Sequence, residues 1–155
     1  MATLGDAFPS DFKEEFSQAR GISPGDVLYL WCDFTDPAKL KFLVVVCCNP
    51  LLVLVVNSKI HQFILDRPHL LECQVDLPLD DHDFLKHDSH VDCVEAHQAF
   101  SLNEVKDAIA ADYGAVLKGR VLDVYMREIY IAVEKSKGIP LRHKKKILAE
   151  MAQYQ

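Results

Sequence analysis

The stretch LKFLVVVCCNPLLVLVV, residues 40–56, decides the fold that we expect for this chain. β-Branched valines dominate it, and Asn49-Pro50 interrupts it with a dipeptide that is typical of turns. Its 17 residues fall short of the roughly 20 that a membrane-spanning helix needs. We therefore predict a buried β-hairpin with strands at 40–48 and 51–58, and no membrane span.

Both strands of this hairpin are apolar on both faces, whereas an antiparallel strand with one face in water alternates. A second layer must therefore cover the outer face of the hairpin. The sequence leaves two candidates open for that layer, the helices near the chain ends and a second subunit.

Working outward from the hairpin, hydrophobic periodicity predicts three further strands and one turn of helix. The predicted strands lie at 26–32, 70–75 and 90–95, and the turn of helix lies at 81–85. Ser10 is placed to cap a short helix that ends at Arg20, and Ser101 with Glu104 forms a capping-box pattern.

The C-terminal third is predicted to be helical, with helices at 101–112, 118–137 and 141–152. Met126, Ile129 and Val133 recur at helical spacing and define the buried face of the middle helix. The element order predicts one α+β domain over 1–155. It comprises an N-terminal helix at 10–20, a small antiparallel β-barrel or sheet at 23–98 and C-terminal helices at 101–152.

The net charge of −6 disfavours a generally cationic nucleic-acid binder. Residues 1–100 hold 7 basic against 16 acidic residues, and residues 101–155 hold 10 against 7. The cysteines number 5, an odd count, and most lie in apolar runs. Buried, reduced thiols in a cytoplasmic protein are the expected reading, and the N-terminal residues lack the features of a signal peptide.

Four segments, in order, resemble the MazF/PemK-like toxin family. They are Pro24-Gly25-Asp26-Val27-Leu28-Tyr29-Leu30, Lys41-Phe42-Leu43-Val44-Val45-Val46, the strand from Pro50 to Ser58, and His87-Asp88-Ser89-His90-Val91-Asp92-Cys93. The resemblance implies an SH3-like β-barrel with C-terminal helices, usually a homodimer that an antitoxin protein holds inactive. It also implies cleavage of single-stranded RNA without a metal or another cofactor, leaving a 2′,3′-cyclic phosphate.

The resemblance places two catalytic positions on this chain. The arginine of the family's R-P motif corresponds to Lys41, and the hydroxyl at the end of the next strand corresponds to Ser58. A lysine supplies only a point charge, and because burial lets it lose its proton more easily, we expect Lys41 to serve as the base or as an electrostatic stabiliser. We expect the neighbouring Lys39, Lys59 and His61 to bind the RNA.

Two other function classes remain open. The first is a non-catalytic SH3-like barrel that binds a protein partner. The second is a metal-binding regulatory domain built on the His- and Asp-rich run at 80–97, although this run lacks a recognised metal-ligand spacing. The basic run at 142–146 is read as a solvated helix face, with contact to RNA phosphates or to an acidic partner as the alternative.

Overall fold

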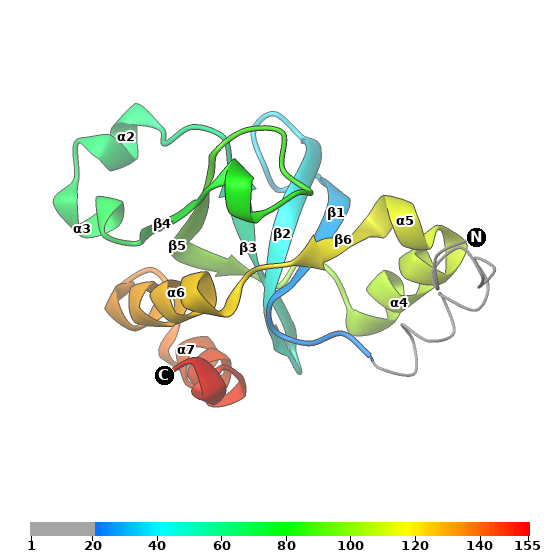
Figure 1. Cartoon of the computed structure of the whole chain (residues 1–155). Helices are drawn as coiled ribbons and strands as arrows, with labels where there is room; N and C mark the ends of the chain where they lie inside the picture. The colour runs from blue at the N-terminus through cyan, green and yellow to red at the C-terminus, as the bar shows by residue number, and fades with distance from the viewer. Residues whose placement is uncertain (1–20) are drawn as a thin grey trace.

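The computed structural model describes residues 21–155, so the helix predicted at 10–20 lies outside the described residues. Six antiparallel strands form one sheet in the order β4-β5-β3-β2-β1-β6, which curls into a half-barrel (Figure 1). The strands are β1 (Asp26–Cys32), β2 (Lys39–Cys48), β3 (Leu51–Asn57), β4 (Gln74–Leu77), β5 (Ser89–His97) and β6 (Leu117–Arg120). The helices are α2 (Gln62–Leu65), α3 (Pro68–Leu71), α4 (Leu102–Ala111), α5 (Tyr113–Val116), α6 (Asp123–Lys135) and α7 (Leu141–Glu150), with 3₁₀ turns η1 (Leu79–Asp81) and η2 (Ala152–Tyr154). The predicted α+β class is confirmed.

The predicted hairpin is formed by β2 and β3, and β3 ends at Asn57, one residue before the expected position. The pairing register shifts between Val45 and Cys47, as in a β-bulge. The Glu150 carboxylate, at the end of α7, accepts a hydrogen bond from the Cys48 backbone N–H at 3.0 Å and another from the Cys47 thiol at 2.7 Å. The last helix is therefore tied to the tip of the hairpin.

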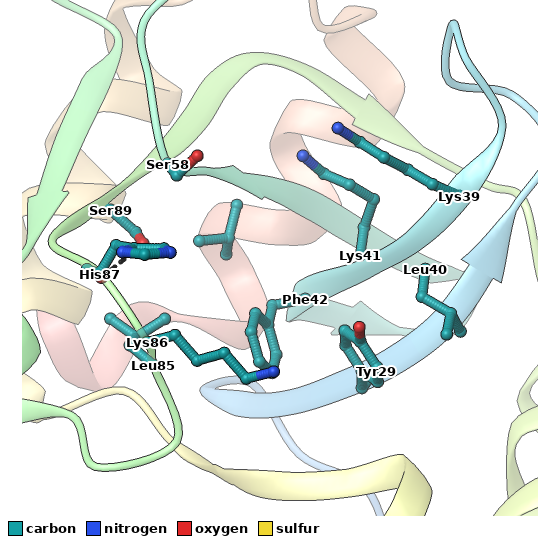
Figure 2. A pocket seen from close by; sticks show the side chains of 11 residues that line it. Tyr29, Lys39, Leu40, Lys41, Phe42, Ser58, Leu85, Lys86, His87 and Ser89 are labelled. Carbon is teal, nitrogen blue, oxygen red and sulfur yellow. Dashed lines mark hydrogen bonds between the residues drawn. The ribbon is translucent and has the colours of Figure 1, made fainter.

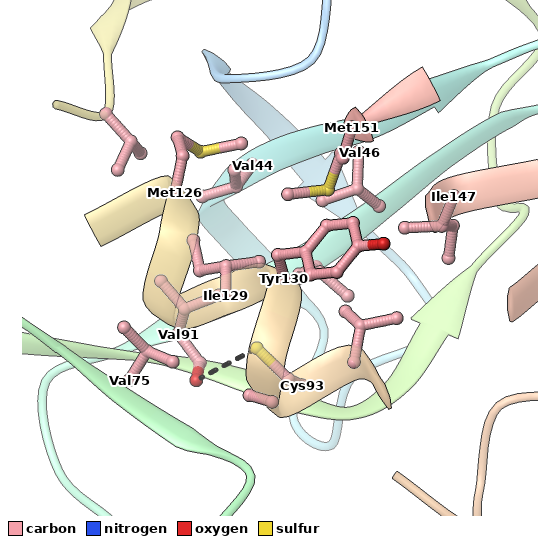
Figure 3. Packing of buried hydrophobic residues seen from close by; sticks show 14 of the residues in the cluster. Val44, Val46, Val75, Val91, Cys93, Met126, Ile129, Tyr130, Ile147 and Met151 are labelled. Atoms are coloured by element: carbon pink, nitrogen blue, oxygen red, sulfur yellow. Dashed lines mark hydrogen bonds between the residues drawn. The ribbon is translucent and has the colours of Figure 1, made fainter. Parts of the chain in front are cut away.

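Helices cover both faces of the sheet, as the apolar hairpin requires. On one face, Val44 and Val46 of β2 pack with Met126 and Ile129 of α6, and α7 adds Ile147 (Figure 3). On the other face, apolar residues of β1, β2 and β3 pack with α4 and α5. Figure 1 shows α6 and α7 on one side of the sheet and α4 and α5 on another. The sequence left two candidates for the layer over the hairpin, helices and a second subunit. In the structure, helices form this layer.

The strand predicted at 70–75 is wrong over residues 70–73. Residues 68–71 form α3, and the strand begins only at Gln74. Pro68 explains the difference, because its fixed φ angle suits the first turn of a helix, where its missing N–H costs nothing. The helical turn expected at 81–85 is also displaced, to η1, which begins directly after Pro78.

The helix predicted at 118–137 starts five residues later in the structure, at Asp123, because β6 occupies residues 117–120. β6 pairs with β1 beside the Gly25 turn, and Arg120 reaches the buried Asp26 carboxylate at 2.6 Å. The sheet therefore extends beyond the predicted 23–98 segment. The predicted apolar face survives in α6, where Met126, Ile129 and Val133 are all buried.

Lys144 of the basic run donates hydrogen bonds to the carbonyls of Glu134 and Ser136, at the end of α6. This lysine therefore satisfies carbonyl groups that the helix end leaves unpaired. Among the helices between residues 21 and 155, none combines the length and the apolar character needed to cross a membrane.

Candidate functional site

The structure brings Lys39, Lys41 and Ser58 together in one pocket of about 190 Å³ (Figure 2). The two lysines lie at the start of β2, and Ser58 follows the end of β3. Because β2 and β3 are antiparallel neighbours, the beginning of one strand lies beside the end of the other. The hairpin register therefore places the two positions implied by the family resemblance side by side.

Lys41 is half-buried, and its ammonium group donates a hydrogen bond to the Asn57 side-chain oxygen at 2.5 Å. Burial lowers the pKa of Lys41 below its ordinary value, and the positive charge of Lys39 lowers it further. A lysine with a lowered pKa releases its proton more readily than a solvated one. Lys41 thus has the environment of a proton-transfer group.

The opposite wall of the pocket comes from the segment before β5, which contributes Lys86 and His87, and from Ser89, the first residue of β5. The Ser89 hydroxyl donates a hydrogen bond to the His87 carbonyl at 2.9 Å, which fixes the backbone at this point. Figure 2 shows Ser58 and His87 facing the two lysines across the pocket. The pocket therefore combines three amino groups with an exposed imidazole and a hydroxyl.

Two aromatic side chains also line the pocket. Tyr29 of β1 and Phe42 of β2 are directly opposite in the sheet, and their ring centroids are 4.7 Å apart. The next pair on the same face of the sheet, Trp31 and Leu40, is exposed at 59% and 48%. Aromatic rings beside amino groups are the surface that single-stranded nucleic acids contact, through base stacking and phosphate charge.

Lys59 and His61 do not line this pocket. They follow Ser58 on the segment that leads to α2, where the His61 ring nitrogen accepts a hydrogen bond from the Phe63 N–H at 3.0 Å and caps the helix. Sequence reasoning assigned these two residues to RNA binding and missed Lys86, His87, Tyr29 and Phe42. The paired aromatic positions follow from the strand register, whereas nothing local places Lys86 and His87 opposite β2.

The His- and Asp-rich run is dispersed in the structure. His90 pairs with Asp76 at 2.8 Å, and Asp92 accepts a hydrogen bond from Gln74. His82 is buried and lies 3.0 Å from the Pro78 carbonyl. Within residues 21–155, no group of three or more His, Cys, Asp or Glu residues is close enough to hold a metal ion. The metal-binding alternative therefore has no supporting cluster of ligand side chains among the described residues.

The thiols of Cys47 and Cys48 are poorly suited to act as nucleophiles. Burial, with the Glu150 carboxylate beside both, raises the pKa of Cys47 to about 12 and that of Cys48 to about 11. Thiols with such values stay protonated at neutral pH, and the thiolate is the reactive form. Cys47 is buried in one part of the core and Cys48 packs half-buried against another, in keeping with their apolar surroundings in the sequence.

Comparison with known proteins assigns the chain to no family. A scan against protein-family models matches none, and a search of curated proteins finds no match. The function is therefore argued from the pocket.

Proposed function

We propose that this protein is a MazF/PemK-like barrel, SH3-like in its sheet, that binds single-stranded RNA and cleaves it without a metal. The observation that carries the proposal is the convergence of Lys41, Ser58 and His87 in one pocket with two further lysines. These residues come from three separate segments of the chain. The ring pair of Tyr29 and Phe42, which also lines the pocket, adds a surface on which bases stack.

The residues of the pocket fit the needs of RNA cleavage by its own 2′-hydroxyl. The reaction requires a base for the 2′-hydroxyl proton, an acid for the leaving 5′-oxygen and positive charge near the phosphorane. His87 accepts the 2′-hydroxyl proton as O2′ attacks phosphorus. Lys41 donates a proton to the departing 5′-oxygen, and Ser58 donates a hydrogen bond to a non-bridging oxygen. The products are a 2′,3′-cyclic phosphate and a 5′-hydroxyl.

The lowered pKa of Lys41 supports its role as the acid, because a more acidic ammonium transfers its proton more easily. Lys39 and Lys86 remain at the pocket wall as phosphate-binding charges. An antitoxin partner and a homodimer belong to the same proposal, since the family toxins that the sequence resembles have both.

Induced expression of wild type and single variants tests the proposal. We expect growth arrest and loss of RNA integrity with wild type, and full growth with Lys41→Ala, His87→Ala and Ser58→Ala. Lys137→Ala is the matched control, because Lys137 is exposed and lies outside the pocket. Equal behaviour of wild type and the three pocket variants, at equal protein levels, would contradict a catalytic role.

Binding to a protein partner without catalysis is the second candidate function. It is favoured by the exposed pair Trp31 and Leu40, because solvent-exposed aromatic side chains are enriched at interfaces. This candidate predicts that Trp31→Ala abolishes partner binding and that RNA stays intact in every strain of the expression experiment.

A further inference from the structure

A second hollow of about 430 Å³ adjoins the candidate site. The two share Tyr29, Phe42 and Lys86 as lining residues, so they are neighbours on the surface. The second hollow is completed by Phe84, Lys118 and Asp83. Its size is within the range of small-molecule sites, and its lining combines aromatic rings, amino groups and one carboxylate.

The aromatic lining is held in place by its neighbours. The ring centroids of Phe42 and Phe84 are 5.7 Å apart, which extends the Tyr29–Phe42 pair into a row of three rings. Phe84 lies directly against β6 at Gly119, where an added Cβ atom would come within 3.0 Å of its ring. The missing side chain of Gly119 therefore makes room for Phe84, so the three rings lie together at the hollow.

The charged groups are arranged around this row. The Lys118 ammonium lies 5.7 Å from the centre of the Tyr29 ring and donates a hydrogen bond to the Gly114 carbonyl at 3.0 Å. Asp83 is exposed, and its carboxylate has no hydrogen-bond partner within residues 21–155. The hollow thus offers positive charge for phosphates and one free acceptor group for a ligand.

We propose that this second hollow binds an unpaired guanine of the RNA strand, next to the phosphate that the first pocket holds. The inference rests on the proposed function, because it names the nucleotide that accompanies the cleaved linkage. A carboxylate only accepts hydrogen bonds. Guanine alone among the four RNA bases presents two adjacent donors, N1–H and N2–H₂, on its Watson–Crick edge, so one carboxylate accepts both.

The other bases fit Asp83 less well. Adenine and cytosine each present one amino group beside a ring-nitrogen acceptor, and uracil presents a single N–H between two carbonyl oxygens. Each of these acceptors would face the negative charge of Asp83. Two matched hydrogen bonds to a base discriminate against the wrong base by about fivefold or more.

The test measures RNA binding without cleavage. Fluorescence anisotropy is recorded with six-nucleotide 2′-O-methyl RNAs, which lack the attacking hydroxyl. One probe is all uridine, and three others carry a single central guanosine, adenosine or cytidine. We expect the guanosine probe to bind the wild-type protein at least about fivefold more tightly than the other probes.

Two variants assign the preference to the hollow. Asp83→Asn should reduce the guanosine preference to less than about twofold, while the all-uridine affinity stays the same or rises because a negative charge is lost. Asp80→Asn is the matched control, because Asp80 is an exposed carboxylate that does not line either hollow. It should retain the full preference.

The outcomes separate this inference from the proposed function. Equal affinity for the four probes, with the natural RNA still cleaved, would overturn the guanine assignment alone. A guanosine preference that survives Asp83→Asn would overturn it as well. If wild type binds none of the probes and cleaves no RNA, both proposals fail.

Discussion

Lys41 is the residue on which the proposed chemistry depends, and its pKa is measurable. Burial, followed by the charge of Lys39, lowers this pKa from 10.5. Lys39→Ala removes the second cause and leaves the first, so we expect the pKa of Lys41 to rise while staying below 10.5. NMR titration of ¹³C-dimethylated lysines measures both values. An ordinary pKa for Lys41 in wild type would contradict this description of the pocket.

The same pKa sets the pH dependence of cleavage. Lys41 acts as an acid only while it carries its proton, so the rate should fall as the pH rises through the lowered pKa. The fall should therefore begin at a lower pH than an ordinary lysine produces. In Lys39→Ala it should shift to higher pH. A high-pH limb that is identical in the two proteins would exclude Lys41 as the proton donor.

The thiols at the hairpin tip give a further prediction at the residue scale. With pKa values of about 12 and about 11, Cys47 and Cys48 carry almost no thiolate at pH 8. We expect iodoacetamide to leave both unmodified in the folded protein and to label both in urea, as read by mass spectrometry. Labelling of the folded protein at the rate of a free thiol would show that Glu150 and burial do not protect them.

Among the secondary-structure elements, the junction of α6 and α7 packs closely against β5. A Cβ atom added at Gly138 would lie 2.6 Å from the Val94 carbonyl oxygen, which already accepts a hydrogen bond from Ser136 at 2.6 Å. We expect Gly138→Ala to lower the free energy of unfolding by about 1–3 kcal/mol, measured by urea denaturation.

Gly114 is the matched control for this substitution. It lies in α5, and a Cβ atom there would meet no atom within 4 Å. Gly114→Ala should leave stability unchanged or increase it by about 0.5–1 kcal/mol, because alanine favours the helix. A loss of the same size at both positions would show that the contact with Val94 is unimportant.

The sequence predicts the elements that have a strong local signal and misses those that form only through contacts with other segments of the chain. The hairpin follows from its valines, and α4 begins at the expected capping box of Ser101 and Glu104. β6 has only four residues, and its pairing with β1 alone makes it a strand. Similarly, the register of β2 and β3 places Lys41 near Ser58. Lys86 and His87 lie in the long connection between β4 and β5, whose path no local pattern predicts.

For the whole molecule, the uneven distribution of charge is the decisive feature. The net charge is −6, yet the two neighbouring hollows are lined by Lys39, Lys41, Lys86 and Lys118. If these four lysines replace the counterions of RNA phosphates, the logarithm of the binding constant should fall with that of salt concentration with a slope of about −3. Binding titrations at several salt concentrations measure this slope. A slope near zero would mean that the lysines do not contact phosphates.

The most direct test of the central claim uses purified protein and one synthetic single-stranded RNA of mixed sequence, in buffer that contains EDTA. The measurement is the chemical identity of the new RNA ends, read by mass spectrometry for wild type and Lys41→Ala prepared identically. We expect 2′,3′-cyclic phosphate and 5′-hydroxyl ends with wild type and intact RNA with Lys41→Ala. Intact RNA with wild type, or equal cleavage by the two proteins, would contradict this claim.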